Sequence, residues 1–244
     1  MILTIDIGNS RIKSAVFENN NIIKCFVFDS DFFFSEIENI LLKYPKITNL
    51  IVASVGNLEK NAFLEFERIV KIDFISHKTR FPFTNLYQTP KTLGIDRMVL
   101  AAGAVLHFPN CNRLIIDAGT CVTYDYVNDQ NQYLGGAISP GFRLRYESLH
   151  NYTANLPLLN LENQENFIGD STITAIHSGV VNGLLNEING FISQFEAQNS
   201  NFIIILTGGD ADFLAVRLKN TIFANSNFLL ESLNFIYHYT NQNV

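Results

Sequence analysis

The chain is poor in the features that several common classes of protein require. It carries no run of basic residues and its formal net charge is −6, so nucleic acid is not expected as its main partner. No stretch reaches the length of a membrane span without charges or turn signals, so no membrane partner is expected either. Charged residues make up only 16% of the 244 residues and hydrophobic residues 47%, which is ample material for two hydrophobic cores.

Cysteine is scarce as well. The three cysteines, Cys25, Cys111 and Cys121, are odd in number and far apart, so they fit neither a zinc site nor a disulfide framework. This usage is typical of a reducing compartment. Cys25 and Cys121 fall in apolar strand-like runs and are expected to be inert core residues. No leader with a basic and an apolar part precedes the first strand-like run, so we expect a soluble cytoplasmic protein.

The most informative pattern that is present is a turn that occurs once in each half of the chain. Its first copy contains Asp6-Ile7-Gly8-Asn9-Ser10 and its second Asp117-Ala118-Gly119-Thr120. Each follows an apolar run and precedes an alternating run rich in β-forming residues, so each Asp is expected at the tip of a tight β-hairpin. Glycine there lets the backbone come close to a ligand. Two such hairpins facing each other across a cleft can hold the phosphates of a nucleotide, which makes phosphoryl transfer the leading hypothesis.

The whole pattern predicts an α/β protein in which a β-β-β-α-β-α-like unit occurs twice. We expect two homologous halves, residues 1–110 and 111–244, with the active site in the cleft between them. Strands are predicted near residues 1–7, 11–18, 21–28, 50–55, 71–76, 113–117, 121–127, 132–137, 202–206 and 221–223. Helices are predicted near 31–44, 58–69, 98–107, 171–197, 211–218 and 228–241, with a further one that follows a turn at 139–141 and ends near 154. Residues 81–92 should form a loop.

The two Asp carboxylates are candidate metal ligands. A hard divalent cation such as Mg²⁺ takes oxygen ligands and usually combines one or two carboxylates with phosphates of the substrate. An Asp at each of two facing hairpin tips fits that arrangement. Alternatively, each Asp only caps its own turn, as Asp often does. The occurrence of two copies in matched context favours the metal-ligand interpretation.

Candidate phosphate contacts follow the first Asp. The turn amides, the Ser10 hydroxyl and the Lys13 ammonium can together hold the β- and γ-phosphates, although Lys13 can equally be a solvated strand residue. The G-x-x-x-x-G-K-[ST] pattern of a Walker loop is absent. Thr207-Gly208-Gly209 ends an apolar strand and begins a helix, where free N–H groups favour an anion or the edge of a ribose. An ordinary strand-to-helix loop has the same pattern.

The segment Gly94-Ile95-Asp96-Arg97 places a negatively charged and a positively charged side chain next to each other at the start of a strongly apolar helix. Arg97 can hold a carboxylate through two parallel hydrogen bonds. Asp96 can accept the proton of a hydroxyl that is being phosphorylated. The alternative interpretation makes Asp96 a helix N-terminal acid and Arg97 its surface partner. Local context supports both.

Taken together and in order, these motifs resemble those of the type III pantothenate kinases. The matching segments are the two Asp turns, Leu93–Arg97, Leu134–Gly141 and Thr207–Gly209, and they span essentially the whole chain. The G-x-D-R element between two D-x-G turns is the most specific of them. The resemblance implies the acetate and sugar kinase/Hsc70/actin fold, whose halves are of the ribonuclease H-like type, and a homodimer. It also implies ATP-dependent phosphorylation of pantothenate to 4′-phosphopantothenate, the first step of coenzyme A synthesis.

The resemblance further implies roles for individual residues. Contacts to ATP would come from Thr120 and from the segment Asp6, Ile7, Gly8, Asn9, Ser10, Arg11, Ile12 and Lys13, with Gly208 and Gly209 on the adenosine side. Asp96 would be the proton acceptor. The pantothenate site would be lined by Tyr87, Gly94, Ile95, Asp96, Arg97 and Thr172. Asp117 would hold a monovalent cation, K⁺ or NH₄⁺, instead of the Mg²⁺ that its residue type alone suggests, and Asp6 would lie on the Mg²⁺ side of ATP.

Four positions depart from the family pattern. Ser10 stands where Thr is usual and keeps the hydroxyl, and Cys121 stands where Ala is commoner. Ser171 replaces an Asn next to Thr172. Ser232 stands where a Gly is usual in the last helix, which concerns packing only. None of these changes removes a catalytic group.

The expected mechanism is in-line attack by the primary hydroxyl of pantothenate, which Asp96 deprotonates, while Mg²⁺, K⁺ and Lys13 offset the developing charge. Two other functions are compatible with the fold, since a fold alone does not fix function. A catalytically silent nucleotide-binding regulatory protein would have no need of a general base. A kinase for another hydroxy acid or sugar is distinguished by its substrate selectivity, because in a pantothenate kinase Arg97 and Tyr87 would select a carboxylated pantoyl amide.

Overall fold

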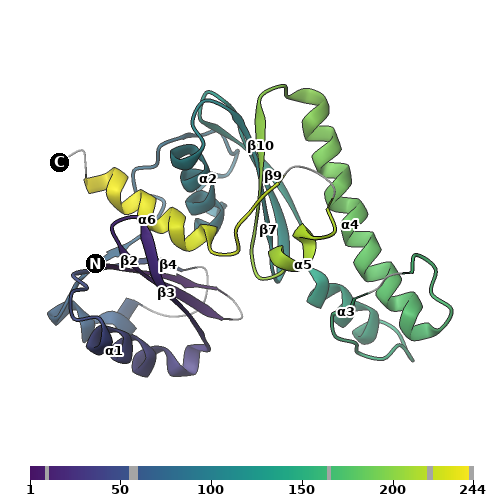
Figure 1. Cartoon of the computed structure of the whole chain (residues 1–244), viewed down its shortest axis with the longest axis horizontal. Helices are drawn as coiled ribbons and strands as arrows, with labels where there is room; N and C mark the ends of the chain where they lie inside the picture. Colours follow the sequence, from purple (N-terminus) through teal and green to yellow (C-terminus); the bar gives the residue numbers. More distant parts are fainter. Residues whose placement is uncertain (9–10, 55–59, 164–165, 219–221, 242–244) are drawn as a thin grey trace. The chain divides into compact units, whose positions relative to one another are not determined.

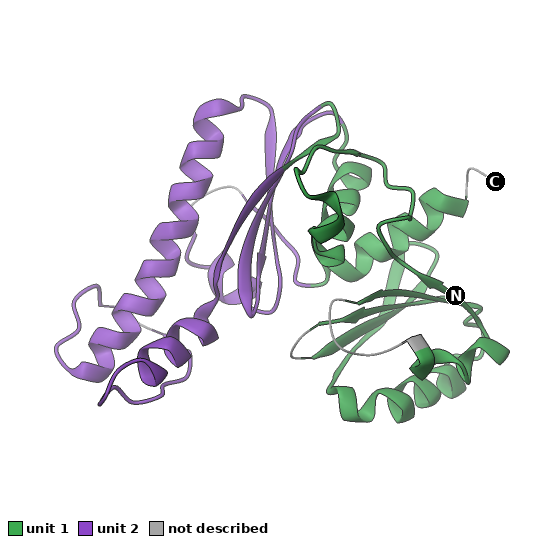
Figure 2. Ribbon diagram, turned by 180° about the vertical axis from the view of Figure 1, so that it is seen from behind, with its two compact units in different colours: residues 1–109, 130–134, 227–244 green, residues 110–129, 135–226 purple. Residues whose placement is uncertain are grey.

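The computed structural model describes residues 1–8, 11–54, 60–163, 166–218 and 222–241, in which strands and helices are mixed along the chain (Figure 1). The mixture confirms the predicted α/β class. The chain forms two compact units (Figure 2). Unit 1 comprises residues 1–109, 130–134 and 227–244, and unit 2 comprises residues 110–129 and 135–226.

Unit 1 is built on a sheet with the strand order β3-β2-β1-β4-β5. Its first three strands form the predicted antiparallel meander, and β1, β4 and β5 pair in parallel. All five strands predicted in this part of the chain are confirmed; β1 and β4 are almost wholly buried, whereas β3 and β5 form the more exposed edges of the sheet. Their bounds are β1 Ile2–Ile7, β2 Ile12–Glu18, β3 Asn21–Phe28, β4 Asn49–Ser54 and β5 Lys71–Phe74.

One face of this sheet packs on the helix α1 (Phe33–Lys43). Successive side chains of a strand point to opposite faces, so Leu3, Ile5 and Ile7 of β1 all enter this core. α1 ends just before Pro45, as predicted, because proline cannot continue the helical hydrogen bonding and disfavours a helical residue before it.

The helix predicted near residues 58–69 is wrong. The described part of this segment contains two 3₁₀ helices, Lys60–Phe63 and Phe66–Arg68. Phe63 and Phe66 are buried and three residues apart, which is the repeat of a 3₁₀ helix. Both rings pack on Phe33, with ring centroids 4.9 and 6.3 Å away. The short turns thus fill the α1 core without a regular α-helix.

The opposite face of the sheet is covered by α2 (Ile95–His107) and α6 (Phe228–Asn241), which pack against each other. α6 has the predicted bounds and joins unit 1 from the other end of the chain. α2 begins at Ile95, before the apolar run predicted at 98–107, so its first turn includes Asp96 and Arg97. Apolar residues of both helices form one core with the sheet. They are Val99 and Ala102 of α2 and Leu230, Leu233 and Ile236 of α6.

Gly103 of α2 lies against Ser232 of α6. A Cβ added at Gly103 would lie 1.8 Å from Ser232 Oγ and 3.0 Å from Ser232 Cα. Ser232 is fully buried, and its hydroxyl donates a hydrogen bond of 2.6 Å to the Phe228 carbonyl oxygen. The two helices therefore have no room for a larger side chain at position 103.

We expect Gly103→Ala to lower the free energy of unfolding by about 1–3 kcal/mol, since overpacking outweighs the roughly 1 kcal/mol that alanine gains in helix propensity. Chemical denaturation measures the loss. In a Ser232→Gly background the same substitution should cost less, because the contacting hydroxyl is gone. Equal costs in both backgrounds would contradict the contact.

The second sheet has the strand order β11-β10-β7-β8-β9-β6. β7 pairs antiparallel with β8 and parallel with β10, and β10 pairs parallel with β11. The strands predicted near 113–117, 121–127, 132–137 and 202–206 are confirmed, although β9 continues through residues 139–140, predicted as a turn. Of the strand predicted at 221–223, residue 221 lies outside the described residues, and the observed strand covers only residues 223 and 224. The bounds are β7 Asn112–Ala118, β8 Cys121–Val127, β9 Gln132–Pro140, β10 Phe202–Thr207 and β11 Phe223–Ala224.

The segment 81–92, predicted as a loop, contains the short strand β6 (Thr84–Asn85) and a 3₁₀ turn at Pro90–Thr92. β6 pairs in parallel with Gln132 and Tyr133, and both partners belong to unit 1. Two residues are too few for an alternating pattern, so the sequence could not mark this strand.

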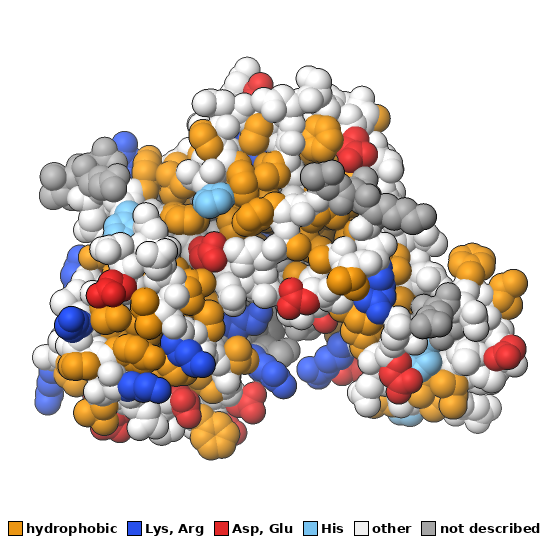
Figure 3. Space-filling model, in the orientation of Figure 1, with side chains coloured by type: hydrophobic (Ala, Val, Ile, Leu, Met, Phe, Trp, Pro, Cys, Tyr) orange, Lys and Arg blue, Asp and Glu red, His pale blue; other side chains and the backbone are white. Residues whose placement is uncertain are grey.

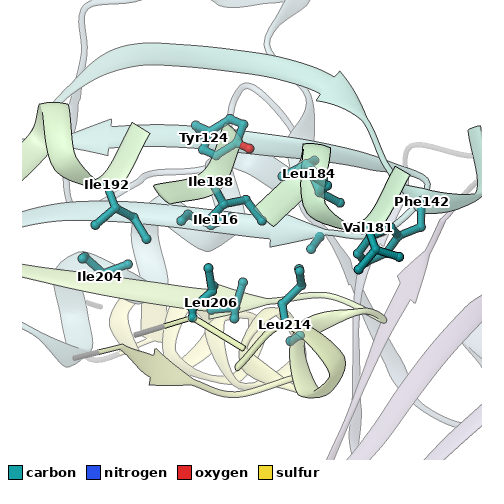
Figure 4. Close-up of a cluster of buried hydrophobic side chains, with 14 of the residues drawn as sticks. Ile116, Tyr124, Phe142, Val181, Leu184, Ile188, Ile192, Ile204, Leu206 and Leu214 are labelled. Carbon is teal, nitrogen blue, oxygen red and sulfur yellow. The ribbon is translucent and has the colours of Figure 1, made fainter. Parts of the chain in front are cut away.

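The core of unit 2 lies between its sheet and the long helix α4 (Thr172–Gln198) (Figure 4). Side chains three or four residues apart on α4 meet alternate residues of β7 and β10. They are Val181, Leu184, Ile188 and Ile192, against Leu114, Ile116, Ile204 and Leu206. The other helices are α3 (Phe142–Asn151) and α5 (Ala211–Ala215), both about three residues shorter than predicted. None of the helices in the described ranges has the length and apolar character that crossing a membrane requires.

Candidate active site

The first Asp turn is a tight β-hairpin, as predicted. Asp6 lies near the end of β1 and pairs in the antiparallel register with Lys13 of β2. Directly paired residues project from the same face of a sheet, so the carboxylate and the ammonium are neighbours. The buried pair Ile7 and Ile12 is the last pair of the ladder before the turn. Lys13 is therefore in place to share a ligand with Asp6.

The turn itself is closed by the Gly8 amide, which donates a hydrogen bond of 3.2 Å to the Arg11 carbonyl oxygen. A Cβ at Gly8 would lie 3.1 Å from that oxygen, so the two strands meet closely here. Arg11 is exposed. The tip residues Asn9 and Ser10, predicted phosphate contacts, lie outside the described residues.

The second Asp turn is also a hairpin, and the motif at residues 207–209 lies against it. Asp117 of β7 pairs in register with Thr207 of β10. Gly208 has a φ of +99°, and a Cβ there would lie 2.2 Å from the Ala118 carbonyl oxygen and 2.5 Å from Asp117 Oδ1. Only glycine fits both the backbone conformation and the space. The two motifs, far apart in the sequence, thus form one site in unit 2.

Oxygen atoms gather around Asp117. Its half-buried carboxylate has a threonine in register on each neighbouring strand, Thr123 and Thr207. Thr207 is 1% exposed, and its Oγ1 has no hydrogen-bond partner among the described residues. A buried hydroxyl in need of a partner, next to a carboxylate, fits a cation that takes oxygen ligands. Among the residues that the structure describes, no group of three or more His, Cys, Asp or Glu side chains is placed to hold a metal ion.

Gly141, which precedes α3, lies against the backbone of the second turn. Its amide donates a hydrogen bond of 3.0 Å to the Thr120 carbonyl oxygen. A Cβ at Gly141 would lie 2.0 Å from the Gly119 carbonyl oxygen and 2.8 Å from that of Thr120. Thr120 itself is exposed. The residue before α3 therefore packs on the backbone of the turn, and the Thr120 side chain stays accessible.

The cysteine predictions hold only in part. Cys121 was expected in a core but is exposed, so that prediction is wrong. It is the first residue of β8, at the tip of the hairpin, where the strand has not yet entered the core. Cys25 packs partly buried against the core of unit 1, and burial raises the pKa of its thiol.

A network of charged and polar side chains connects α3, α4 and the sheet of unit 2, and sequence reasoning missed it. Arg145 Nη2 donates hydrogen bonds to Glu187 Oε2 at 2.5 Å and to Ser139 Oγ at 3.0 Å. The Tyr124 hydroxyl donates to Glu187 Oε1 at 2.8 Å. Arg145 and Glu187 are 42 residues apart, and no local pattern links them.

These contacts decide the charge states in the network. Burial pushes the pKa of Glu187 upward, but the hydrogen bonds from Arg145, Ser139 and Tyr124 leave it below its ordinary value. Burial and the hydrogen bond to Glu187 raise the pKa of Tyr124 far above its ordinary value. At neutral pH the carboxylate is therefore charged and the phenol keeps its proton.

We expect Glu187→Gln to be less stable than the wild type at neutral pH, by about 1 kcal/mol for a partly solvated charged hydrogen bond. The folded pKa is lower than the unfolded one, near 4.3, so the carboxylate stabilises the fold above that value. The stabilisation is lost as pH falls through the folded pKa. Denaturation over a pH series should show the deficit at neutral pH and a progressively smaller one as the pH falls below about 4.3. A deficit that does not change with pH would contradict a role for the charge.

The start of α2 holds Asp96 in a defined position. Gly94 caps the helix, Ile95 begins it, and Asp96 Oδ1 accepts a hydrogen bond of 2.8 Å from the Arg97 amide. This amide is one of those at a helix start that no helical carbonyl reaches. A Cβ at Gly94 would lie 2.4 Å from Asp96 Oδ1, so the glycine keeps room for the carboxylate.

Arg97 is not the surface partner that one interpretation made it. It is 5% exposed, and its Cζ lies 5.9 Å from the centroid of the Tyr87 ring, within the range of a cation–π contact. The Tyr87 ring in turn packs edge-on against Tyr133, with centroids 6.2 Å apart. The Leu86 amide donates to the Tyr133 carbonyl oxygen at 3.0 Å. The structure thus brings Tyr87 next to Arg97 within unit 1, through a strand pairing that the sequence did not predict.

Thr172 is exposed in the first turn of α4. Ser171 caps this helix: its Oγ accepts from the Thr174 amide at 3.2 Å, and Thr174 Oγ1 accepts from the Ser171 amide at 2.9 Å. Serine and asparagine are both good helix caps, so Ser171 can hold Thr172 in place as an asparagine would.

The comparisons with known proteins agree with one another. A family model described as type III pantothenate kinase matches residues 2–194. A type III pantothenate kinase of Flavobacterium johnsoniae is 63% identical over 239 residues, which cover 98% of this chain and 98% of the relative. In Flavobacterium psychrophilum a protein of the same name is 64% identical over 239 residues, which cover 98% of this chain and 99% of the relative.

A solved structure from Campylobacter jejuni, described as a Baf family transcriptional activator, has a TM-score of 0.59 at 22% identity over 99% of this chain and 100% of its own. The activator of 2-hydroxyisocaproyl-CoA dehydratase from Clostridium difficile, with ADPNP bound, has a TM-score of 0.56 at 12% identity over 100% of this chain and 97% of its own. These two likenesses concern the fold alone. They confirm the predicted acetate and sugar kinase/Hsc70/actin fold.

Proposed function

Because this chain belongs to the type III pantothenate kinase family, we propose that its two hairpins and the start of α2 carry the transfer of the γ-phosphate of ATP to pantothenate. The reaction is the ATP-dependent phosphorylation of pantothenate to 4′-phosphopantothenate, the first step of coenzyme A synthesis. The division of the chain into homologous halves at residues 110 and 111 stays a prediction.

The observation that carries the proposal is the first turn of α2. A buried arginine, Arg97, stands next to a carboxylate, Asp96, that is held by a backbone amide, and Tyr87 lies over the guanidinium. A buried guanidinium suits the carboxylate of pantothenate, because its planar fork makes two parallel hydrogen bonds. We assign Asp96 as the base that takes the proton of the primary hydroxyl, with Gly94, Ile95 and Thr172 as further substrate contacts.

The ATP side is assigned to the hairpins. The segment Asp6 to Lys13 would contact the phosphates, with Thr120, and Gly208 and Gly209 would lie on the adenosine side. The register that sets Lys13 beside Asp6 supports this, since one ammonium can then reach a phosphate oxygen close to the carboxylate. A divalent metal ion bound with ATP neutralises charge on the transferred phosphate. We propose Mg²⁺ for this ion, with Asp6 on its side.

Asp117 is assigned to a monovalent cation, K⁺ or NH₄⁺. The buried Thr207 hydroxyl in register with it supports an oxygen-lined cation site. A larger, weakly hydrated ion tolerates such a mixed set of hydroxyl, carboxylate and phosphate ligands better than Mg²⁺, which requires near-ideal octahedral geometry.

We also propose a homodimer in the cytoplasm. The three cysteines are free thiols, which suits a reducing compartment. Large apolar side chains are exposed on the segment between α3 and α4 and at the start of α4 (Figure 3). They are Tyr152, Leu158, Phe167, Ile168 and Ile173. We take these exposed apolar side chains as support for a contact with a second copy.

The proposal is tested by ADP release from the purified protein with ATP, Mg²⁺ and pantothenate, in K⁺ and in Na⁺. We expect turnover that requires pantothenate and is much faster in K⁺, and an Asp117→Asn variant that has lost this preference. Turnover equal in both salts would keep the kinase and remove the cation from Asp117. ATP binding without turnover in either salt would instead favour the nucleotide-binding regulator.

A further inference from the structure

The Arg145 network described above reaches the backbone on which the second turn rests. Besides its bonds to Glu187 and Ser139, Arg145 donates from Nε to the Pro140 carbonyl oxygen at 2.8 Å. One guanidinium therefore binds the two residues that precede Gly141. All of these residues lie in unit 2.

The position of Gly141 decides where the turn can lie. Its amide hydrogen bond to the Thr120 carbonyl oxygen, and the absence of space for even a Cβ against Gly119, leave no slack between the two backbones. A shift of the segment at 139–141 must therefore move the turn that carries Thr120. Arg145 fixes that segment through two of its residues, by a side-chain and a main-chain acceptor.

Arg145 is itself fixed from two sides. Glu187 projects from α4, and its second oxygen accepts from the Tyr124 hydroxyl of β8. The Tyr124 ring stacks on Phe191, with ring centroids 3.9 Å apart. Side-chain exposure is only 20% for Arg145 and 25% for Glu187. The guanidinium is thus held in one orientation by the core of unit 2.

A second ion pair on α3, formed within the helix itself, lacks these contacts to α4 and the sheet. Arg143 Nε donates to Glu147 Oε1 at 2.7 Å, four residues further along, and 68% of the Arg143 side chain is exposed. This pair touches only its own helix and contributes little to stability. The contrast sets Arg145 apart as the arginine of α3 that binds the supporting segment.

We propose that Arg145, held by Glu187, is a positioning residue for the nucleotide: it fixes the Ser139–Gly141 segment that supports Thr120, and so sets the affinity for ATP. This inference rests on the proposed function, in which Thr120 contacts ATP. Small displacements of a positioned group can cost as much as 100-fold. We therefore expect Arg145→Met to raise the KM for ATP by about 10- to 100-fold and to leave the KM for pantothenate within about twofold.

The test measures both KM values and the binding of a non-hydrolysable ATP analogue with Mg²⁺ by calorimetry, for Arg145→Met, Arg145→Lys and Glu187→Gln. Lysine keeps the charge but not the fork, so it should recover only part of the loss. Arg143→Met is the matched control on the same helix and should resemble the wild type. Melting temperatures accompany every variant. If Arg145→Met does not fold, the KM for ATP and the analogue binding of Arg145→Lys and Glu187→Gln test the inference.

Selective weakening of ATP in a folded Arg145 variant, with partial recovery in the lysine variant, would support the inference. Unchanged ATP parameters would overturn it. Equal losses for both substrates, in step with a lower melting temperature, would also overturn it, because they indicate a structural role only. A wild-type protein that binds the analogue but does not phosphorylate pantothenate would refute the proposed function instead, and analogue binding by the variants would still test Arg145.

Discussion

Asp96→Asn should bind ATP and pantothenate as the wild type does and lose about 10²- to 10⁴-fold in kcat, the usual size of a general-base contribution. Asparagine has nearly the same shape, and its amide oxygen can still accept the hydrogen bond that the Arg97 amide gives to Asp96 Oδ1. The start of α2 is therefore preserved. What the variant lacks is a group that can take the proton of the attacking hydroxyl. Steady-state kinetics together with pantothenate binding separate the two effects.

A control for this experiment is Glu36→Gln, which neutralises an acid in the first turn of α1, in the same unit. It should leave kcat unchanged, because a helix-terminal charge alone contributes only a few tenths to about 1 kcal/mol of stability. Near wild-type turnover in Asp96→Asn would refute the assignment of the base. A loss of pantothenate binding in that variant would show that Asp96 acts mainly in recognition.

Arg97→Ala should raise the KM for pantothenate by about 10- to 100-fold with a smaller change in kcat, since a hydrogen bond to a charged group contributes roughly 1.5–3 kcal/mol. Arg97 is almost fully buried beside Tyr87, so water cannot replace the lost cation well. Arg97→Lys should also bind poorly, because an ammonium cannot reproduce the two parallel hydrogen bonds of a guanidinium. The KM for ATP should remain near that of the wild type.

Unit 1 offers a matched control for this substitution. Arg80 lies over the Tyr239 ring with its Cζ 5.7 Å from the ring centroid, the same type of contact as that of Arg97 and Tyr87, but Arg80 is exposed. Arg80→Ala should leave both KM values unchanged. An unchanged pantothenate KM in Arg97→Ala would contradict the carboxylate clamp. An analogue of pantothenate without its carboxylate should show no difference between wild type and Arg97→Ala.

The longer strands of both units follow from the sequence because each is a run of β-forming residues bounded by turn residues, whereas the two-residue strand β6 does not. The errors occur where local pattern is not decisive. The 3₁₀ turns around Phe63 are determined by packing on Phe33, which lies far away in the sequence. The start of α2 was placed too late, since an apolar run marks the buried part of a helix and not its first turn. Cys121 was predicted in a core because it belongs to an apolar strand-like run. The first residue of a strand, however, can lie outside the core that the rest of the strand enters.

The site was predictable to the extent that its motifs are local. Both Asp hairpins follow from a strand, a glycine and a second strand. The contact between Gly208 and Asp117 depends on the pairing of β10 with β7, and that of Tyr87 with Tyr133 depends on a two-residue strand. The ion pair of Arg145 and Glu187 joins two helices. Such long-range contacts depend on which strands and helices are neighbours in the fold. Local patterns in a single sequence do not predict those neighbours.

The order in which unit 1 is assembled has a consequence for synthesis on the ribosome. Its sheet is complete after β5, but α6, which covers one face of that sheet together with α2, leaves the exit tunnel only after the whole of unit 2. Until then apolar residues such as Ile2, Phe17 and Val99 lack part of their cover. Unit 2, apart from one crossing at residues 130–134, is a continuous insertion within unit 1 and can fold first. A nascent chain stalled before residue 227 should therefore depend on chaperones for its first half and not for its second.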